Sequence, residues 1–88
     1  MRKIVLSPHC EKELIKLLRK NSELESRINK VFRILEANIL DSSLKIHKLH
    51  GKFSMLYACS ITHEYRLVFS YDKEFVYLHT IGSHDEVY

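Results

Sequence analysis

The chain has 88 residues, of which 45% are hydrophobic, and its formal net charge is +3. This length predicts a single domain spanning residues 1–88, and the composition is that of a folded globular protein. The mild positive charge neither requires nor excludes a nucleic-acid partner. No apolar run approaches the roughly 20 residues of a membrane span, and no signal-peptide core is present, so we expect a cytoplasmic protein.

The first half of the chain predicts a short strand followed by two helices. Lys3–Leu6 has the composition of a strand, and Ser7-Pro8 has the N-cap and first-position residues of a helix. Ser22 and Glu25 have the S-x-x-E spacing of a capping box that opens a second helix. Apolar residues recur at helical spacing in both segments, which predicts an antiparallel pair of helices that covers one face of a sheet: Cys10, Leu14, Leu17 and Leu18, then Leu24, Ile28, Val31, Phe32, Leu35 and Ile39.

A basic connector, residues 44–52, precedes the second half of the chain and contains no acidic residue. A local concentration of cations is what a phosphate ligand requires, and lysine acts there as a point charge. We therefore expect phosphate binding here, with an ordinary polar connector as the alternative. The residues concerned are Lys45, His47, Lys48, His50 and Lys52.

Residues 54–88 predict a three-stranded antiparallel meander. Three runs of β-branched, aromatic and aliphatic residues are separated by His63-Glu64 and by Asp72-Lys73-Glu74. With the first strand, this gives an α+β fold in which the helices pack on a mainly antiparallel sheet of four strands.

Turns of two residues would assign each side chain of the meander to a face, because opposed residues share a face. The expected core face carries Leu56, Ala58, Ser60, Leu67, Phe69, Tyr71, Val76 and Leu78. The expected opposite face carries Tyr57, Cys59, Ile61, Arg66, Val68, Ser70, Tyr77, His79 and Ile81. A loop of odd length would exchange these faces.

Arg66 and His84 lie near one end of the expected sheet and suit acid–base chemistry on a phosphodiester. Histidine exchanges protons near neutral pH, and arginine can bind a phosphate and stabilise charge in the transition state. An aromatic side chain such as Tyr57, Tyr77 or Tyr88 could stack on a base. An ion pair between Arg66 and Glu64 is the structural alternative.

The cysteines and histidines raise two further possibilities, a zinc site and a nucleophilic thiol. The spacings match no zinc-ligand pattern, and Cys59 lacks the local sequence of a catalytic cysteine. We therefore expect no metal or cofactor and two packed, free thiols, Cys10 and Cys59. A pair of Cys59 with His79 or His84 is the alternative.

The order of elements, together with the segments EYRLVFSYD and LHTIGSHDEVY, resembles the RelE/ParE superfamily of bacterial type II toxins. The resemblance is greatest to the RelE-like and YafQ-like mRNA interferases. It implies a toxin that enters the ribosomal A site and cuts mRNA, with the 2′-hydroxyl as nucleophile and without a metal. A ParE-like inhibitor of DNA gyrase and a non-catalytic homologue that only binds its antitoxin are the alternatives.

The resemblance also assigns roles to individual residues. Arg66 matches the catalytic strand arginine, His84 the basic residue after the last strand, His47 the histidine before the meander, and Tyr88 the C-terminal aromatic. The residues expected to bind RNA are Lys45, Lys48, His50, Lys52 and Tyr57.

The sequence departs from the family pattern at four positions. Tyr57 and Cys59 stand where RelE has lysines, and Ser60 and Glu64 stand where the YafQ-like branch has a histidine and an aspartate. The implied partner is an antitoxin whose amphipathic, locally acidic segment covers Arg66 and His84 or blocks entry to the ribosome by its bulk.

Overall fold

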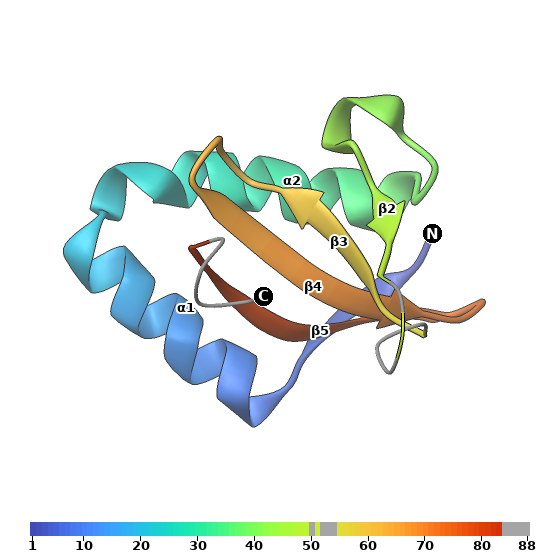
Figure 1. Cartoon of the computed structure of the whole chain (residues 1–88), viewed down its shortest axis with the longest axis horizontal. Coiled ribbons are helices and arrows are strands. Elements are labelled where there is room, and N and C mark those ends of the chain that lie inside the picture. The colour runs from blue at the N-terminus through green and yellow to red at the C-terminus, as the bar shows by residue number, and fades with distance from the viewer. Residues whose placement is uncertain (50, 52–54, 84–88) are drawn as a thin grey trace.

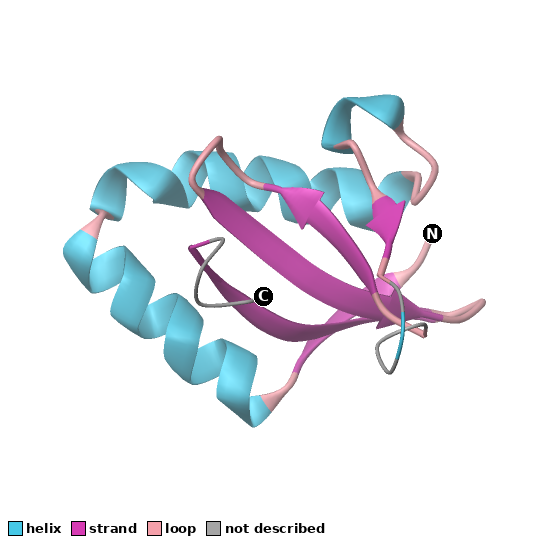
Figure 2. Cartoon of the chain, viewed as in Figure 1, coloured by secondary structure: helices cyan, strands magenta, loops and turns pink. Residues whose placement is uncertain are grey.

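Two helices and a five-stranded mixed sheet make up this α+β fold (Figures 1 and 2). The structure, a computed structural model, describes residues 1–49, 51 and 55–83. The strand order is β1-β5-β4-β3-β2, and only the β1–β5 pair is parallel. The strands are β1 (Lys3–Leu6), β2 (His47–Lys48), β3 (Tyr57–Ser60), β4 (Tyr65–Tyr71) and β5 (Phe75–Ser83).

The prediction of a four-stranded sheet is therefore wrong in one respect. The basic connector, to which we assigned no strand, contributes the edge strand β2 by pairing with β3. This strand is only two residues long, too short for a period-two pattern to identify it from the sequence.

Helix α1 (Pro8–Lys20) begins as predicted, because the Ser7 hydroxyl accepts a hydrogen bond from the Cys10 N–H at 3.0 Å. Helix α2 (Glu25–Ala37) begins differently. A 3₁₀ turn, η1 (Ser22–Leu24), leads into it, and the N-cap position is held by Leu24 without a side-chain hydrogen bond. The predicted capping box of Ser22 and Glu25 is thus wrong, because the chain is already helical at these residues.

Both helices pack on one side of the sheet, and the predicted apolar stripes form the core (Figure 1). Burial of this apolar surface is the main driving force for the fold. The core includes Cys10 from α1, then Ile28, Val31 and Leu35 from α2, and Leu67, Phe69, Val76, Leu78 and Ile81 from the central strands.

The register between β3 and β4 differs by one residue from our expectation. Ser60 pairs with Arg66, so five residues lie between the last paired positions, and the Ile61 N–H bonds to the Tyr65 carbonyl at 2.9 Å. This odd number exchanges the faces of β3. Tyr57, Cys59 and Ile61 therefore face the core, whereas Ala58 and Ser60 share the face of Arg66.

The second hairpin has a two-residue turn, Lys73-Glu74, and pairs Tyr71 with Val76. This is one of the two positions, with Asp72-Lys73, at which a two-residue turn gives the predicted faces. A bulge then interrupts β5: Val68 pairs with Thr80 and Phe69 with Leu78, which leaves His79 unpaired. Beyond the bulge, Ile81 pairs with Leu67 and is buried in the core, so the prediction that it shares a face with Arg66 is wrong.

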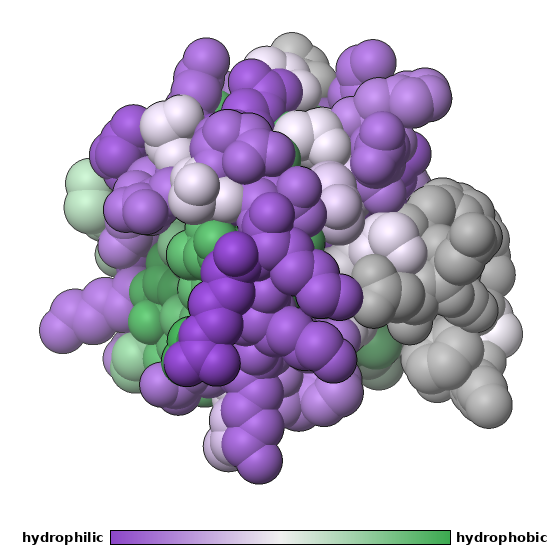
Figure 3. Space-filling model, turned by 90° about the vertical axis from the view of Figure 1, so that its left-hand side faces the viewer, coloured by the Kyte–Doolittle hydropathy of each residue, from purple (hydrophilic) through white to green (hydrophobic). Residues whose placement is uncertain are grey.

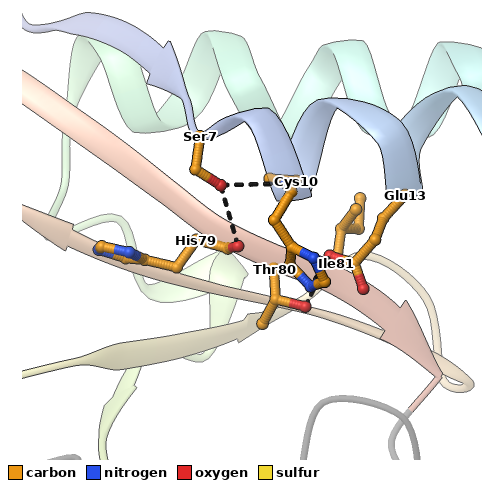
Figure 4. Close-up of polar contacts among 7 residues, drawn as sticks. Ser7, Cys10, Glu13, His79, Thr80 and Ile81 are labelled. Carbon is orange, nitrogen blue, oxygen red and sulfur yellow. Dashed lines mark hydrogen bonds and ion pairs between the residues drawn. The ribbon is translucent and has the colours of Figure 1, made fainter.

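The N-cap residue of α1 and one of its side chains bind the part of β5 that lies beyond its pairing with β1 (Figure 4). The Ser7 hydroxyl donates to the His79 carbonyl at 3.1 Å. One carboxylate oxygen of Glu13 accepts bonds from the Thr80 hydroxyl at 2.7 Å and the Ile81 N–H at 3.1 Å. These contacts fix the end of β5, the strand that precedes His84 in the sequence.

The surface on the side of the turn between α1 and α2 is mostly hydrophilic, with a smaller apolar area beside it (Figure 3). Within the residues that the structure describes, neither helix is long and apolar enough to cross a membrane.

Candidate active site

The sheet face opposite the helices, which we call the outer face, carries the candidate site. Its side chains form rows across the strands, spaced by about 7 Å because a row recurs every second residue. The first row is Ser60, Arg66 and Gly82, the second is His47, Ala58, Val68 and Thr80, and the third is Ser70 and Tyr77.

The guanidinium of Arg66 is held by the turn of its own hairpin. Its Nη1 donates to the carbonyl oxygens of Thr62 at 2.9 Å, His63 at 3.0 Å and Tyr65 at 3.4 Å. The ion pair with Glu64 that we weighed is not formed. Because the acceptors are neutral, they orient the guanidinium without cancelling its charge, which therefore stays available to an anion.

The same hairpin is braced from the helix side. Arg27 of α2 donates from Nε to the Ile61 carbonyl at 2.7 Å, and the Asn21 amide lies 3.3 Å from the Tyr65 hydroxyl. No local sequence pattern connects Arg27 to this turn, which lies 34 residues away in the sequence. These contacts preorganise the turn that holds Arg66.

His47 lies on the outer face, but not in direct contact range of the Arg66 backbone. It pairs with Ala58, two strands and one row away from Arg66, which corresponds to about 12 Å between Cα atoms. Its Nδ1 is 3.5 Å from the Lys45 carbonyl. Lys45 has a φ of 52°, an uncommon value for a residue with a side chain, so the backbone turns sharply just before β2.

Lys48 and Tyr57 pair with each other and lie on the helix-covered face. Our expectation that Tyr57 shares a face with Arg66 is therefore wrong, for the reason of register given above. The other expected lysine-equivalent position, Cys59, is fully buried on the same face. The residues of β3 that do share a face with Arg66 have small side chains, Ala58 and Ser60.

The structure does not support a nucleophilic Cys59–His79 pair. Cys59 faces the core, and His79 lies on the outer face with its Nε2 2.8 Å from the Ser70 hydroxyl. Burial raises the pKa of the Cys59 thiol to about 12, against the smaller opposite effect of the Arg66 charge. Cys10 and Cys59 are thus free, buried thiols, as predicted.

Sequence reasoning also missed two features near the outer face. The Ser70–His79 contact depends on the bulge in β5, for which the sequence gives no signal. A cavity of 250 Å³ beside the end of β5 is lined by Lys16 and Lys20 of α1 and by Gly82 of the Arg66 row, among other residues. Cations of α1 therefore stand at one end of that row.

Four of the predicted site residues lie outside the described part of the chain: His84, Tyr88, His50 and Lys52. Among the residues that the structure describes, no group of three or more His, Cys, Asp or Glu side chains could hold a metal ion.

The helical pair, the mixed five-stranded sheet and the strand arginine define a toxin of the RelE/ParE superfamily. A sequence profile of the YafQ family, bacterial toxins of type II toxin–antitoxin systems, matches residues 2–88, and the chain belongs to this family. It is therefore the toxin component of such a system, and mRNA cleavage is the activity known for the family.

Solved structures share the fold along nearly the whole chain. A copper-bound mutant toxin from Helicobacter pylori has 29% sequence identity and a TM-score of 0.87, with 100% of both chains covered. YafQ from E. coli has 17% identity and a TM-score of 0.83, covering 100% of this chain and 99% of that one. The toxin of an E. coli DinJ–YafQ complex has 19% identity and a TM-score of 0.82, covering 99% and 97%. No curated protein sequence is significantly similar.

Proposed function

We propose that this toxin is a ribosome-dependent endoribonuclease that cuts mRNA without a metal ion. The observation that carries the proposal is the guanidinium of Arg66, which is oriented by neutral carbonyl oxygens on the outer face of a YafQ-family toxin. A preorganised cation of this kind stabilises negative charge that grows during phosphoryl transfer.

The proposed reaction begins with attack of a ribose 2′-hydroxyl on the adjacent phosphorus. The 2′-oxygen–phosphorus bond forms, the bond to the 5′-oxygen breaks, and a 2′,3′-cyclic phosphate results. A general base takes the 2′-hydroxyl proton, and a general acid gives a proton to the leaving 5′-oxygen. His47 and His84 would share these proton transfers, and Arg66 would bind the charged phosphorane. Tyr88 would be the C-terminal aromatic residue of the site.

The basic connector would anchor the RNA backbone. Lys45 lies just before β2, His47 is the first residue of β2, and both are exposed. His50 and Lys52 extend this basic segment in the sequence. Contacts of this kind to phosphate position a strand and make its binding dependent on salt.

The proposed reaction needs no metal ion, because side chains can perform each of its steps. Arg66 supplies the charge stabilisation, and histidines supply the proton transfers, for which a metal ion would otherwise be needed. We expect cleavage to continue in EDTA under conditions that keep the ribosome intact. Loss of cleavage in EDTA with recovery in one specific divalent ion would overturn this part of the proposal.

The proposed partner is a separate antitoxin. The E. coli relative with the same fold was solved as a DinJ–YafQ toxin–antitoxin complex. Because the outer face presents Arg66 without a carboxylate partner among the described residues, an acidic amphipathic segment would suit it. Such a segment could cover the site, or its bulk could block entry to the ribosome.

Primer extension on cellular mRNA after induction of the toxin tests the proposal. New 5′ ends within translated codons, absent in untranslated RNA, are the expected result. A gyrase supercoiling assay distinguishes the ParE-like alternative. Growth arrest with intact mRNA and inhibited supercoiling would contradict the proposed function.

A further inference from the structure

Two tyrosines and two cations gather at the end of the sheet opposite the Arg66 hairpin. The ring centroids of Tyr57 and Tyr71 are 5.1 Å apart, and the Arg2 guanidinium lies 5.1 Å from the centre of the Tyr71 ring. Lys48 pairs with Tyr57 and so shares its face. We call Arg2, Lys48, Tyr57 and Tyr71 the edge cluster; Lys48 is exposed, and the other three are half-buried.

The cluster presents hydrogen-bond donors and positive charge. Burial and a hydrogen bond with Tyr57 raise the pKa of Tyr71, and the Arg2 and Lys48 charges oppose this shift. The Tyr71 hydroxyl therefore stays protonated, and able to donate, at neutral pH. No carboxylate is among the groups that shift the pKa of Tyr71 in the described part of the chain.

Asp72, an acid beside Arg2, is already engaged in hydrogen bonds. The Arg2 Nε donates to the Asp72 carbonyl at 2.7 Å, and the Arg2 charge also helps to lower the pKa of the Asp72 carboxyl. That carboxylate accepts bonds from the Glu74 and Phe75 N–H groups and from the Tyr77 hydroxyl, all at 2.8 Å. The Asp72 carboxylate therefore offsets part of the charge of Arg2 but not that of Lys48.

The edge strand β2 connects the cluster to the outer face. It is the last strand of the sheet and only two residues long. His47 lies on the outer face with Ala58, and its neighbour Lys48 lies on the opposite face with Tyr57. A flexible ligand such as a single RNA strand can pass around this edge from one face to the other. It would meet His47 on the outer face and Lys48 on the opposite face.

We propose that the edge cluster binds a backbone phosphate of the RNA strand whose scissile nucleotide lies near Arg66. The strand passes His47, turns around β2 and places one phosphate between Arg2 and Lys48. One tyrosine hydroxyl donates to a phosphate oxygen, since the hydrogen bond between Tyr57 and Tyr71 uses the other O–H group. This inference rests on the proposed function, since it assigns a second contact to the same substrate. It explains why Tyr57 and Lys48, which lie away from Arg66, stand beside further cationic and aromatic groups.

Binding of an uncleavable 2′-O-methyl RNA oligonucleotide, measured by fluorescence anisotropy over a range of salt, tests the proposal. The variants are Lys48→Gln, Arg2→Gln and the double variant, each first shown by circular dichroism and urea denaturation to be folded. We expect the double variant to bind about tenfold more weakly or worse, since it loses charged hydrogen bonds. The salt dependence should fall by about 0.7 in log K per log salt, the value for one phosphate contact on a single strand.

The matched control is Lys30→Gln with Arg33→Gln, which removes the same charge from exposed positions of α2. Its salt dependence should equal that of the wild type. An unchanged slope in the edge-cluster double variant, an equal drop in the control, or failure of the wild type to bind the oligonucleotide would overturn the inference. Loss of antitoxin binding with unchanged RNA binding would also overturn it, because the cluster would then be a protein interface. Cleavage of programmed ribosomes, measured separately, decides the proposed function.

Discussion

The Nη1 atom of Arg66 lies 2.9 Å from the carbonyl oxygen of Thr62, within the turn that joins β3 to β4. The side chain proposed to stabilise the transition state therefore also holds its own hairpin together. Activity and local stability are coupled at this position, so variants that weaken the hairpin from elsewhere are needed to separate the two effects.

Arg27 offers such a variant. Arg27→Ala removes the bond from Nε to the Ile61 carbonyl, and we expect the free energy of unfolding to fall by about 1–2 kcal/mol, since a part-buried carbonyl loses a charged donor. Urea denaturation measures this change. Cleavage should also slow, because the turn that orients Arg66 loses its helix-side brace. Lys30→Ala, on the same helix and exposed, should change neither quantity measurably.

Glu13 should be important for the end of β5. Glu13→Ala leaves the Ile81 N–H and the Thr80 hydroxyl without their acceptor, and we expect a loss of about 1–3 kcal/mol in the free energy of unfolding. Glu13→Gln keeps an acceptor oxygen and should lose less. His9→Ala serves as the control, because His9 contacts Glu13 from the surface with 71% of its side chain exposed. A Glu13→Ala protein as stable as the wild type would contradict the role given to these bonds.

The buried thiol of Cys59 predicts a loss of stability in alkaline solution. Burial raises its pKa from 9.0 to about 12 in the folded protein. Between these values the unfolded chain releases the thiol proton and the folded chain retains it, so the unfolded state binds fewer protons and stability falls as pH rises. The slope from this thiol is at most about 1.4 kcal/mol per pH unit.

Urea denaturation of wild type and Cys59→Ala between pH 8 and 10.5 measures that slope, for which the pKa values of about 9 and 12 set the window. The variant will have a different absolute stability, because it leaves a small cavity. Its stability should nevertheless fall less steeply with pH. Parallel curves would show that the Cys59 thiol ionises equally in both states.

Much of the fold could be read from the sequence because local chemistry encodes it. Ser7-Pro8 starts a helix, the apolar stripes of both helices reach the core, and the second hairpin has a turn of two residues, as predicted. The faces of β3 and of the end of β5 could not be read, since each depends on one residue. The hairpin before Arg66 has an odd number of unpaired residues, and His79 is an unpaired bulge residue. A period-two pattern carries no information about either.

The candidate site, like the fold, was predicted only in part. Arg66 and His47 do share the outer face, but Tyr57 and Cys59 do not, as a direct result of the register. Arg27, Asn21 and the Ser70–His79 pair were not foreseen, because tertiary contacts alone bring them to the hairpin and the outer face.

Cleavage of mRNA on programmed ribosomes by Arg66→Ala, compared with His79→Ala, tests the account most directly. His79 contacts Ser70, which lies four residues from Arg66 along β4. This spacing places Ser70 about 14 Å from Arg66, so the loss of the His79 side chain should have little effect at the scissile phosphate. We predict that Arg66→Ala lowers the single-turnover rate about 10²- to 10³-fold, while His79→Ala, and Arg27→Ala despite its weaker hairpin, retain far more activity. An Arg66→Ala protein that is folded and cleaves at the wild-type rate would contradict the central claim.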